Sequence, residues 1–212
     1  MNGKFFDLKK EKQDRMINAA LKVFALHGYR HASTDDIVRE AAISKGLLFH
    51  YFGSKLGVYS FIYDYSVRYM TLELSTNVDR KATDMFTLMK QIECARMHAM
   101  RGYPYMQQFL NRSMSEDVSE ALLAIEDKRN ILTDAYDNIN NQMNFEELPA
   151  DVDGEKLRKM LDFTIKGMLF FQSNCWCGKK RIPSFTLFPQ DEKIFNGYSK
   201  SCGEYTQTPE IR

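Results

Sequence analysis

The sequence predicts an all-α protein, and three observations lead to that prediction. Leu, Met, Ala, Lys and Glu, which favour helices, are spread through most segments. No stretch alternates apolar and polar residues with the period of a strand, and only five prolines interrupt the 212 residues. A hydrophobic content of 44% is enough for a packed core. We therefore expect ordered helices, divided into an N-terminal domain at 1–56 and a larger domain at 57–212.

The first predicted helix spans residues 9–27. Its apolar residues follow the i, i+3, i+4, i+7 spacing of one buried helical face, and they are Ile17, Ala20, Leu21 and Phe24. Gly28 comes next, and glycine commonly ends a helix because it adopts the left-handed conformation at little cost. The pattern therefore predicts one amphipathic helix that ends at Gly28.

Three serines predict the starts of the next three helices, because a serine side chain can accept a hydrogen bond from a free amide of the first turn. Ser33, with Thr34 as the alternative, precedes a short helix whose first turn carries two acidic residues that the helix dipole favours. Ser44 precedes a second short helix after a tight turn. Ser54 precedes a long helix that runs to about residue 74. Further helices are expected near 82–102, 104–112, 116–144, 154–178 and 190–203, with residues 181–190 as the clearest loop.

The two short helices around a tight turn, supported by the first helix, have the layout of a helix-turn-helix unit. Ile37, Ala41, Ile43 and Leu48 can pack inward on the first helix. The opposite face would meet DNA bases: polar side chains donate to base edges, glycine allows close approach, and leucine can contact a thymine methyl. These candidate base-reading residues are Lys45, Gly46, Leu47 and His50. Candidate phosphate-binding residues are Thr34, Ser44, Tyr51 and Lys55.

Charge agrees with a DNA-facing N-terminus. Residues 1–60 hold 10 Lys and Arg against 6 Asp and Glu, whereas residues 61–212 hold 19 against 22. The net charge of +1 for the whole chain hides this difference.

Residues 17–55 resemble the DNA-binding domain of the TetR family of bacterial transcriptional regulators. The resemblance rests on a combined pattern: Ala19-Ala20, Phe24, Gly28-Tyr29, Ser33-Thr34, Ile37, Ala41, Ser44-Lys45-Gly46, Leu48, His50-Tyr51-Phe52 and Lys55. Leu47, Phe49 and Ala42 depart from it, where Thr or Ser, Tyr, and Gly are common. The resemblance implies a homodimer whose C-terminal helical domain binds a small-molecule effector and dimerises through its last two helices.

Large flexible or aromatic side chains predict where an effector would bind. Methionine adapts to different ligands and tyrosine adds a polar group, although an ordinary core explains the same residues. The effector-pocket candidates are Tyr63, Met89, Met97, Met100, Tyr103, Met106, Phe109, Phe163 and Phe171. Few charged residues accompany them, so we expect an apolar or aromatic ligand. The dimer-interface candidates are Gly167, Met168, Phe171, Ile194 and Tyr198.

The sequence therefore predicts a ligand-responsive repressor that binds a palindromic double-stranded DNA operator as a homodimer. The alternative is a constitutive DNA-binding architectural protein without a small-molecule site. The sequence carries no catalytic motif, and the Cys-Trp-Cys stretch at 175–177 lacks zinc spacing, so we expect no enzyme activity, metal or cofactor. The four scattered cysteines and the short apolar runs indicate a reduced cytoplasmic protein that does not associate with a membrane.

Overall fold

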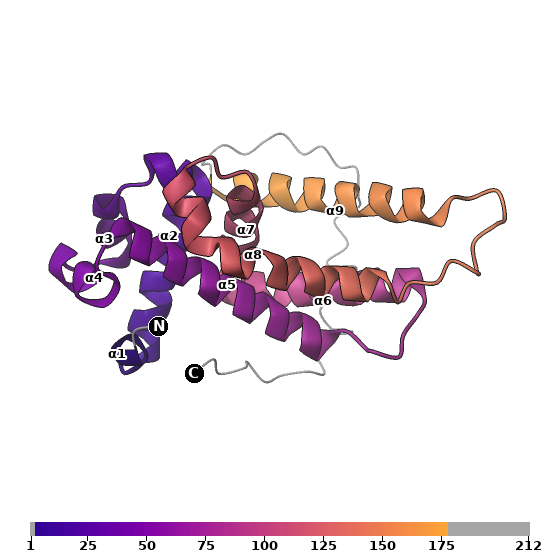
Figure 1. The fold of residues 1–212 in the computed structure, drawn as a ribbon, viewed down its shortest axis with the longest axis horizontal. Helices are drawn as coiled ribbons and strands as arrows, with labels where there is room; N and C mark the ends of the chain where they lie inside the picture. The colour runs from indigo at the N-terminus through magenta and orange to yellow at the C-terminus, as the bar shows by residue number, and fades with distance from the viewer. Residues whose placement is uncertain (1–2, 178–212) are drawn as a thin grey trace. The chain divides into compact units, whose positions relative to one another are not determined.

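The computed structural model describes residues 3–177, with side chains described as far as residue 165, and these residues form helices without a named strand (Figure 1). The prediction of an all-α fold is therefore confirmed. The helices of this range are α1 (Gly3–Phe6), α2 (Lys10–His31), α3 (Thr34–Ala41), α4 (Lys45–Phe52), α5 (Lys55–Asn77), α6 (Met85–Gly102), α7 (Met106–Met114), α8 (Ser119–Asn140) and α9 (Gly154–Cys177). The expected helix at 190–203 and the expected loop at 181–190 lie outside the described residues.

Three helices begin where serine caps were predicted. The hydroxyl oxygen of Ser33 accepts a hydrogen bond from the backbone amide of Asp35 at 3.1 Å. Ser44 accepts one from Leu47 at 3.2 Å, and Ser54 accepts one from Gly57 at 3.0 Å. Each cap satisfies an amide that would otherwise lack a partner in the first helical turn. Local side-chain chemistry therefore sets the starts of α3, α4 and α5.

The first helix differs from its prediction at Gly28. This residue has φ 67° and ψ 177°, so the expected positive φ is present. The chain nevertheless resumes a helical turn and continues to His31, whereas the sequence predicted an end at Gly28. A side chain at position 28 would also be crowded, because a Cβ there would lie 3.0 Å from Nε of Arg112. Gly28 is thus a break within α2 rather than its end.

Two other features of the N-terminal part were not predicted. Residues 3–6 form the short helix α1, which is too short to show a periodic apolar pattern in the sequence. A glycine at position 57 should weaken the first turn of α5, because glycine has a low helix propensity. The packing of α4 on α5 nevertheless requires a glycine here. A Cβ at this position would lie 1.9 Å from the backbone oxygen of Phe52. The close approach of α4 to α5 therefore depends on glycine here.

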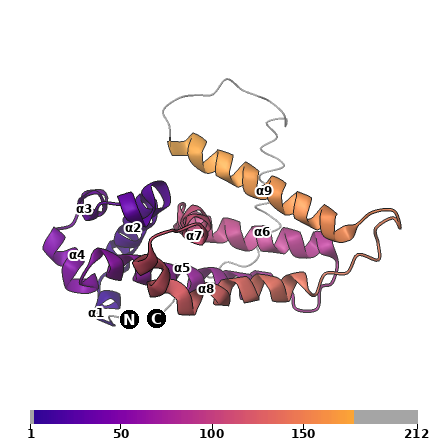
Figure 2. The same ribbon diagram turned by 45° about the horizontal axis from the view of Figure 1, so that its top comes forward.

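Helix α5 passes through the middle of the unit formed by residues 3–149 and packs against α2, α4, α6, α7 and α8 (Figures 1 and 2). Phe24 of α2 joins this centre, since its ring centroid lies 5.1 Å from that of Tyr59 and 6.2 Å from that of Phe109. All three side chains are at most 1% exposed. One aromatic core therefore connects the N-terminal helices with α5 and α7.

Residues from 150 onward belong to a second unit, of which α9 is the described helix. The predicted domain boundary after residue 56 stays a prediction. Among the described helices none is long and apolar enough to span a bilayer.

Replacing Phe24 with alanine should lower the free energy of unfolding by about 3–5 kcal/mol, the usual cost of removing a buried phenylalanine ring. Phe86→Ala is the matched control, because Phe86 on α6 is 53% exposed. Urea unfolding followed by circular dichroism measures both variants. Equal small losses for the two variants would contradict the central place of the aromatic core.

Candidate nucleic-acid interface

The turn between α3 and α4 has the tight geometry of a helix-turn-helix. Ala42 ends α3 in the left-handed conformation, with φ 51° and ψ 52°. The amide of Ala42 donates to the backbone oxygen of Arg39 at 3.3 Å, and the amide of Ile43 donates to that of Val38 at 3.0 Å. Ser44 then caps α4. Only three residues, Ala42 to Ser44, therefore redirect the chain from one helix into the next.

The inward face of the two short helices is buried as the sequence predicts. Ile37 and Ala41 of α3 are 0% exposed, and Leu48 of α4 is 1% exposed. Helix α2 supplies the buried residues Ile17 and Leu21, and it packs directly on α3. Ile43, also expected in this seam, is only half-buried. The seam holds α3 and α4 against α2 and thereby determines which α4 residues face outward.

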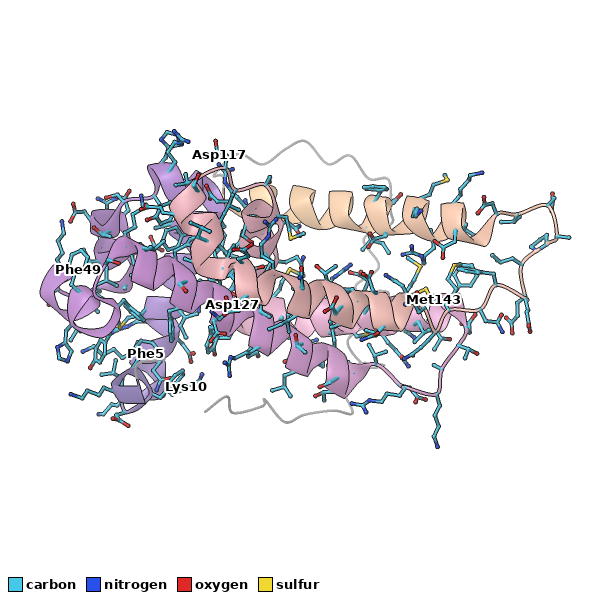
Figure 3. All side chains as sticks on the ribbon, in the orientation of Figure 1. Phe5, Lys10, Phe49, Asp117, Asp127 and Met143 are labelled. Atoms are coloured by element: carbon cyan, nitrogen blue, oxygen red, sulfur yellow. The ribbon has the colours of Figure 1, made fainter. Side chains whose placement is uncertain are left out.

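The candidate base-reading residues occupy the first two turns of α4, at the edge of the unit (Figure 3). Lys45, Gly46 and His50 are exposed, and Leu47 is half-buried. A Cβ added at Gly46 would meet nothing within 4 Å, so the space outside this backbone is open. Polar, apolar and glycine positions are thus combined on one accessible surface, as a helix entering a major groove requires.

Lys45 already has a partner. Its Nζ lies 2.8 Å from Oδ1 of Asp35 on α3, and the two side chains are 51% and 66% exposed. An ion pair this exposed contributes about 0–1 kcal/mol. A phosphate or base edge could therefore replace Asp35 at little cost in free energy.

The candidate phosphate-binding residues differ in their surroundings. Thr34 and Tyr51 are half-buried, and Ser44 is exposed while capping α4. Nζ of Lys55 donates to the backbone oxygen of Arg30 at 3.2 Å and lies 4.7 Å from the Tyr29 ring centroid. Partial burial lowers the pKa of the Lys55 amine below its ordinary value. The Lys55 amine thus has partners within the protein, whereas its position at the start of a helix predicted an amine directed at a phosphate.

Two hydrogen-bonded groups attach α2 to the later helices. At one end of α2, the Tyr29 amide donates to Oε2 of Glu116 at 3.0 Å, and the Tyr29 hydroxyl donates to Oε1 of Glu120 at 2.6 Å. Burial raises the pKa of the Tyr29 phenol, and the hydrogen bond to Glu120 raises it further, so it remains a donor. At the other end, the Tyr103 hydroxyl donates to Oδ1 of Asp14 at 2.7 Å.

The effector-pocket candidates lie in different environments. Tyr63, Tyr103, Met106 and Phe109 are buried, and Met89, Met97 and Met100 of α6 are half-buried. The rings of Tyr63 and Phe109 contact each other, with centroids 6.4 Å apart. Phe163 of α9 is 74% exposed, and the Phe171 side chain lies outside the described residues.

Sequence reasoning missed a buried polar pair between α5 and α6. Glu73 is 4% exposed, accepts a hydrogen bond from Nδ2 of Asn77 at 3.1 Å, and has Oε2 3.7 Å from Nδ1 of His98. The other imidazole nitrogen of His98 is buried without a hydrogen-bond partner. No motif in the sequence marks these residues, since their spacing of 25 positions becomes a contact only through the packing of α5 on α6.

The dimer-interface candidates can be located only in part. Gly167 lies on α9, is exposed, and has open space around an added Cβ. The side chains of Met168 and Phe171, and the whole of Ile194 and Tyr198, lie outside the described part of the chain. Within that described part, no group of three His, Cys, Asp or Glu side chains could hold a metal ion.

Replacing Ala42 with glycine should stabilise the protein by up to about 1 kcal/mol, because glycine adopts the left-handed conformation without the steric cost that Cβ adds. Ala41→Gly, one residue earlier within helical backbone, is the contrasting variant and should destabilise by more than about 0.5–1 kcal/mol, because it also removes a buried methyl group. Thermal unfolding of both variants checks the prediction. A loss of stability in Ala42→Gly would show that the turn is not strained.

Comparison with known proteins agrees with this geometry. Residues 16–60 match the model of the family described as bacterial regulatory proteins, tetR family. The HTH-type transcriptional regulator YuxN of Bacillus subtilis is 42% identical over 59 residues, which are 26% of this chain and 20% of that protein. TtgW, an HTH-type transcriptional regulator of Pseudomonas putida, is 41% identical over 49 residues, 23% of this chain and 37% of TtgW. The chain thus matches well under half the length of either relative.

The fold also has relatives among solved structures. A TetR family transcriptional regulator from Chloroflexus aurantiacus superimposes with a TM-score of 0.51 and 18% identity, over 95% of this chain and 93% of that one. The names of these relatives all describe transcriptional regulators. The buried seam, the capped turn and the family match together identify the N-terminal part of the chain as a helix-turn-helix domain of the TetR family of bacterial regulatory proteins.

Proposed function

We propose that the chain is a transcriptional regulator that binds double-stranded DNA through α3 and α4. The observation that carries the proposal is the division of α4 into two faces. Leu48 is buried against the rest of the domain, whereas Lys45, Gly46 and His50 face outward on an unobstructed surface. In this proposal α4 enters the major groove, and these residues, together with Leu47, read base edges.

Phosphate contacts would come from the residues around α4. Thr34 and Ser44 stand at the starts of α3 and α4, where free amides and the helix dipole attract anions. Tyr51 can add a hydroxyl from the end of α4. Lys55 can contribute its charge from the start of α5 while its amine remains close to the Arg30 carbonyl. Such contacts position the protein on the duplex without selecting sequence.

The proposal includes a homodimer on a palindromic operator, with one recognition helix per subunit in successive major grooves. Met160 and Phe163 on α9 support a partner-facing surface, since they are 66% and 74% exposed although both are large and apolar. Repression would follow when the bound dimer blocks a promoter. A regulator of this kind would act in the cytoplasm, where a bacterial chromosome lies, and would need no membrane.

The proposal also includes release from the operator by a small apolar or aromatic effector. The half-buried methionines of α6 are suited to adapt to such a ligand. Tyr29 of α2 donates hydrogen bonds to Glu116 and Glu120, and Tyr103 donates one to Asp14 of α2. These bonds connect α2 directly to the part of the chain that contains α6, α7 and α8. A ligand that shifts α6–α8 would therefore act on the helix that supports α3 and α4, and DNA would weaken ligand binding by the same factor.

A constitutive architectural protein is the alternative. It would bind DNA with the same surface, and no compound would change its affinity. A thermal-shift screen with apolar, anionic and metal compounds, followed by DNA titration with each hit, separates the two functions. An apolar hit that lowers DNA affinity favours the regulator, whereas hits that leave the affinity unchanged favour the alternative.

Lys45→Ala and His50→Ala should each weaken binding to a duplex selected by the wild-type chain from a random pool by about 5- to 150-fold, the range for one base contact. Binding to a scrambled duplex should change much less. Fluorescence anisotropy at several salt concentrations measures both affinities. Lys128→Ala on α8 removes the same charge away from the proposed surface and is the control. Equal effects of all three variants would exclude α4 as the recognition helix.

Gly167→Leu should convert a dimer to monomers without unfolding the chain. The leucine has open space within the subunit, so a loss of association would report a close approach by a partner helix. Sedimentation velocity at micromolar concentration measures the state of each variant. Gly102→Leu, at the end of α6 with equally open surroundings, is the control and should remain dimeric. A monomeric wild-type protein would refute the proposed dimer.

A further inference from the structure

The short helix α1 precedes the family match at residues 16–60 and is nevertheless built into the candidate DNA-binding surface. Phe5, the third of its four residues, is 0% exposed. Its ring centroid lies 5.8 Å from that of Tyr51, 5.3 Å from that of Phe52 and 5.0 Å from that of Phe61. Phe5 thus fills the space between the last turn of α4 and the second turn of α5. Figure 3 labels Phe5 on α1 and Phe49 on the neighbouring α4.

A buried side chain of α2 holds this segment in place. Gln13 is 7% exposed, and its Nε2 donates to the backbone oxygen of Phe6 at 3.0 Å and to that of Leu8 at 2.7 Å. The amide of Leu8 also donates to the backbone oxygen of Phe5 at 3.2 Å. Because buried polar groups without partners are costly, these bonds favour one path of the chain into α2. Residues 3–8 are therefore a fixed part of the domain and not a loose end.

The contacts of Phe5 continue outward to a candidate base-reading residue. The rings of Phe5 and Tyr51 meet edge to face at 80°, and the rings of Tyr51 and His50 meet at 75° with centroids 5.0 Å apart. Aromatic rings that meet edge to face attract each other beyond the burial of their surface. His50 itself is exposed, so the Tyr51 ring is a support that limits its orientations.

We propose that Phe5 is a positioning residue for DNA recognition, which orients His50 through Tyr51 from a segment that lies outside the family's shared domain. The proposal rests on the function proposed above, in which His50 reads a base edge. Phe5 touches no DNA in this arrangement. It sets the position of the end of α4 relative to α5, and its loss would let the Tyr51 and His50 side chains sample other orientations before binding.

The first experiment needs no DNA and therefore tests positioning separately from function. The imidazole proton signals of the free protein are recorded by NMR, and His50→Gln identifies the His50 signals. Phe5→Ala should move the His50 signals and leave those of the half-buried His98 on α6 unchanged. Phe6→Ala is the control, because it removes a neighbouring ring of the same segment that packs on Phe5 and Phe61. Unmoved His50 signals in a folded Phe5→Ala protein would overturn the proposal.

The second experiment measures binding to the selected duplex and to its scrambled counterpart. Phe5→Ala should weaken binding to the selected duplex by up to about tenfold, which corresponds to about 1.4 kcal/mol, and should leave the scrambled duplex nearly unaffected. In a His50→Ala background the same substitution should have little further effect, because the residue that it positions is gone. Additive losses in the double variant would contradict action through His50.

Phe5→Leu keeps the site filled and serves as the second variant if Phe5→Ala does not fold. It should retain most of the stability but lose the edge-to-face contact, so its His50 signals should also move. If the wild-type chain binds no duplex, the proposed DNA-binding function fails, while the NMR result still decides whether Phe5 positions His50.

Discussion

The middle of helix α5 is enclosed by neighbouring helices, and the arrangement of the other helices in residues 3–149 depends on this. The six successive residues 62–67 are all buried, although they point in every direction around the helix axis. Most surface helices bury one stripe, so this pattern requires partners on all sides. The partners are α2, α4, α6, α7 and α8. A helix enclosed in this way cannot shift without moving several others.

Because α5 follows α4 directly in the chain, the position of α5 constrains the position of α4. Gly53 and Ser54 alone separate the two helices, and Gly57 lets the Phe52 carbonyl approach α5 closely. The orientation of α4, which carries the candidate base-reading residues, is therefore tied to α5. The hydrogen bonds of Tyr29 and Tyr103 tie α2 to the later helices in parallel. Packed helices move between discrete arrangements rather than continuously, which is how a change near α6 could reach α4.

Features that depend on neighbouring residues in the chain could be predicted from the sequence. The serine caps of α3, α4 and α5 and the buried stripe of α2 are of this kind, because they follow from local hydrogen bonding and helical periodicity. The outward residues of α4 followed from the same periodicity. Gly28 shows the limit of local reasoning. Its positive φ was expected, but the turn that follows it also makes contacts with Arg112 of α7 and with Glu116 and Glu120, which lie far away in the sequence.

Features that depend on distant contacts could not be predicted. The burial of Phe5 depends on α4 and α5, and the pairing of Glu73 with His98 depends on how α5 packs on α6. The partner of Lys45 was likewise missed, since Asp35 appeared to serve the helix dipole alone. In each case the residue type is compatible with several contacts, and the contact that forms depends on which helices pack together.

The proposed surface for duplex DNA consists of α3, α4 and the start of α5, supported from behind by α1 and α2. Hydrogen–deuterium exchange of the chain with and without the selected duplex tests this assignment. We expect slower exchange concentrated in residues 34–55, weakening as salt is raised because phosphate contacts contribute to binding. Slower exchange confined to residues beyond 80, or none under conditions where the duplex binds, would contradict it.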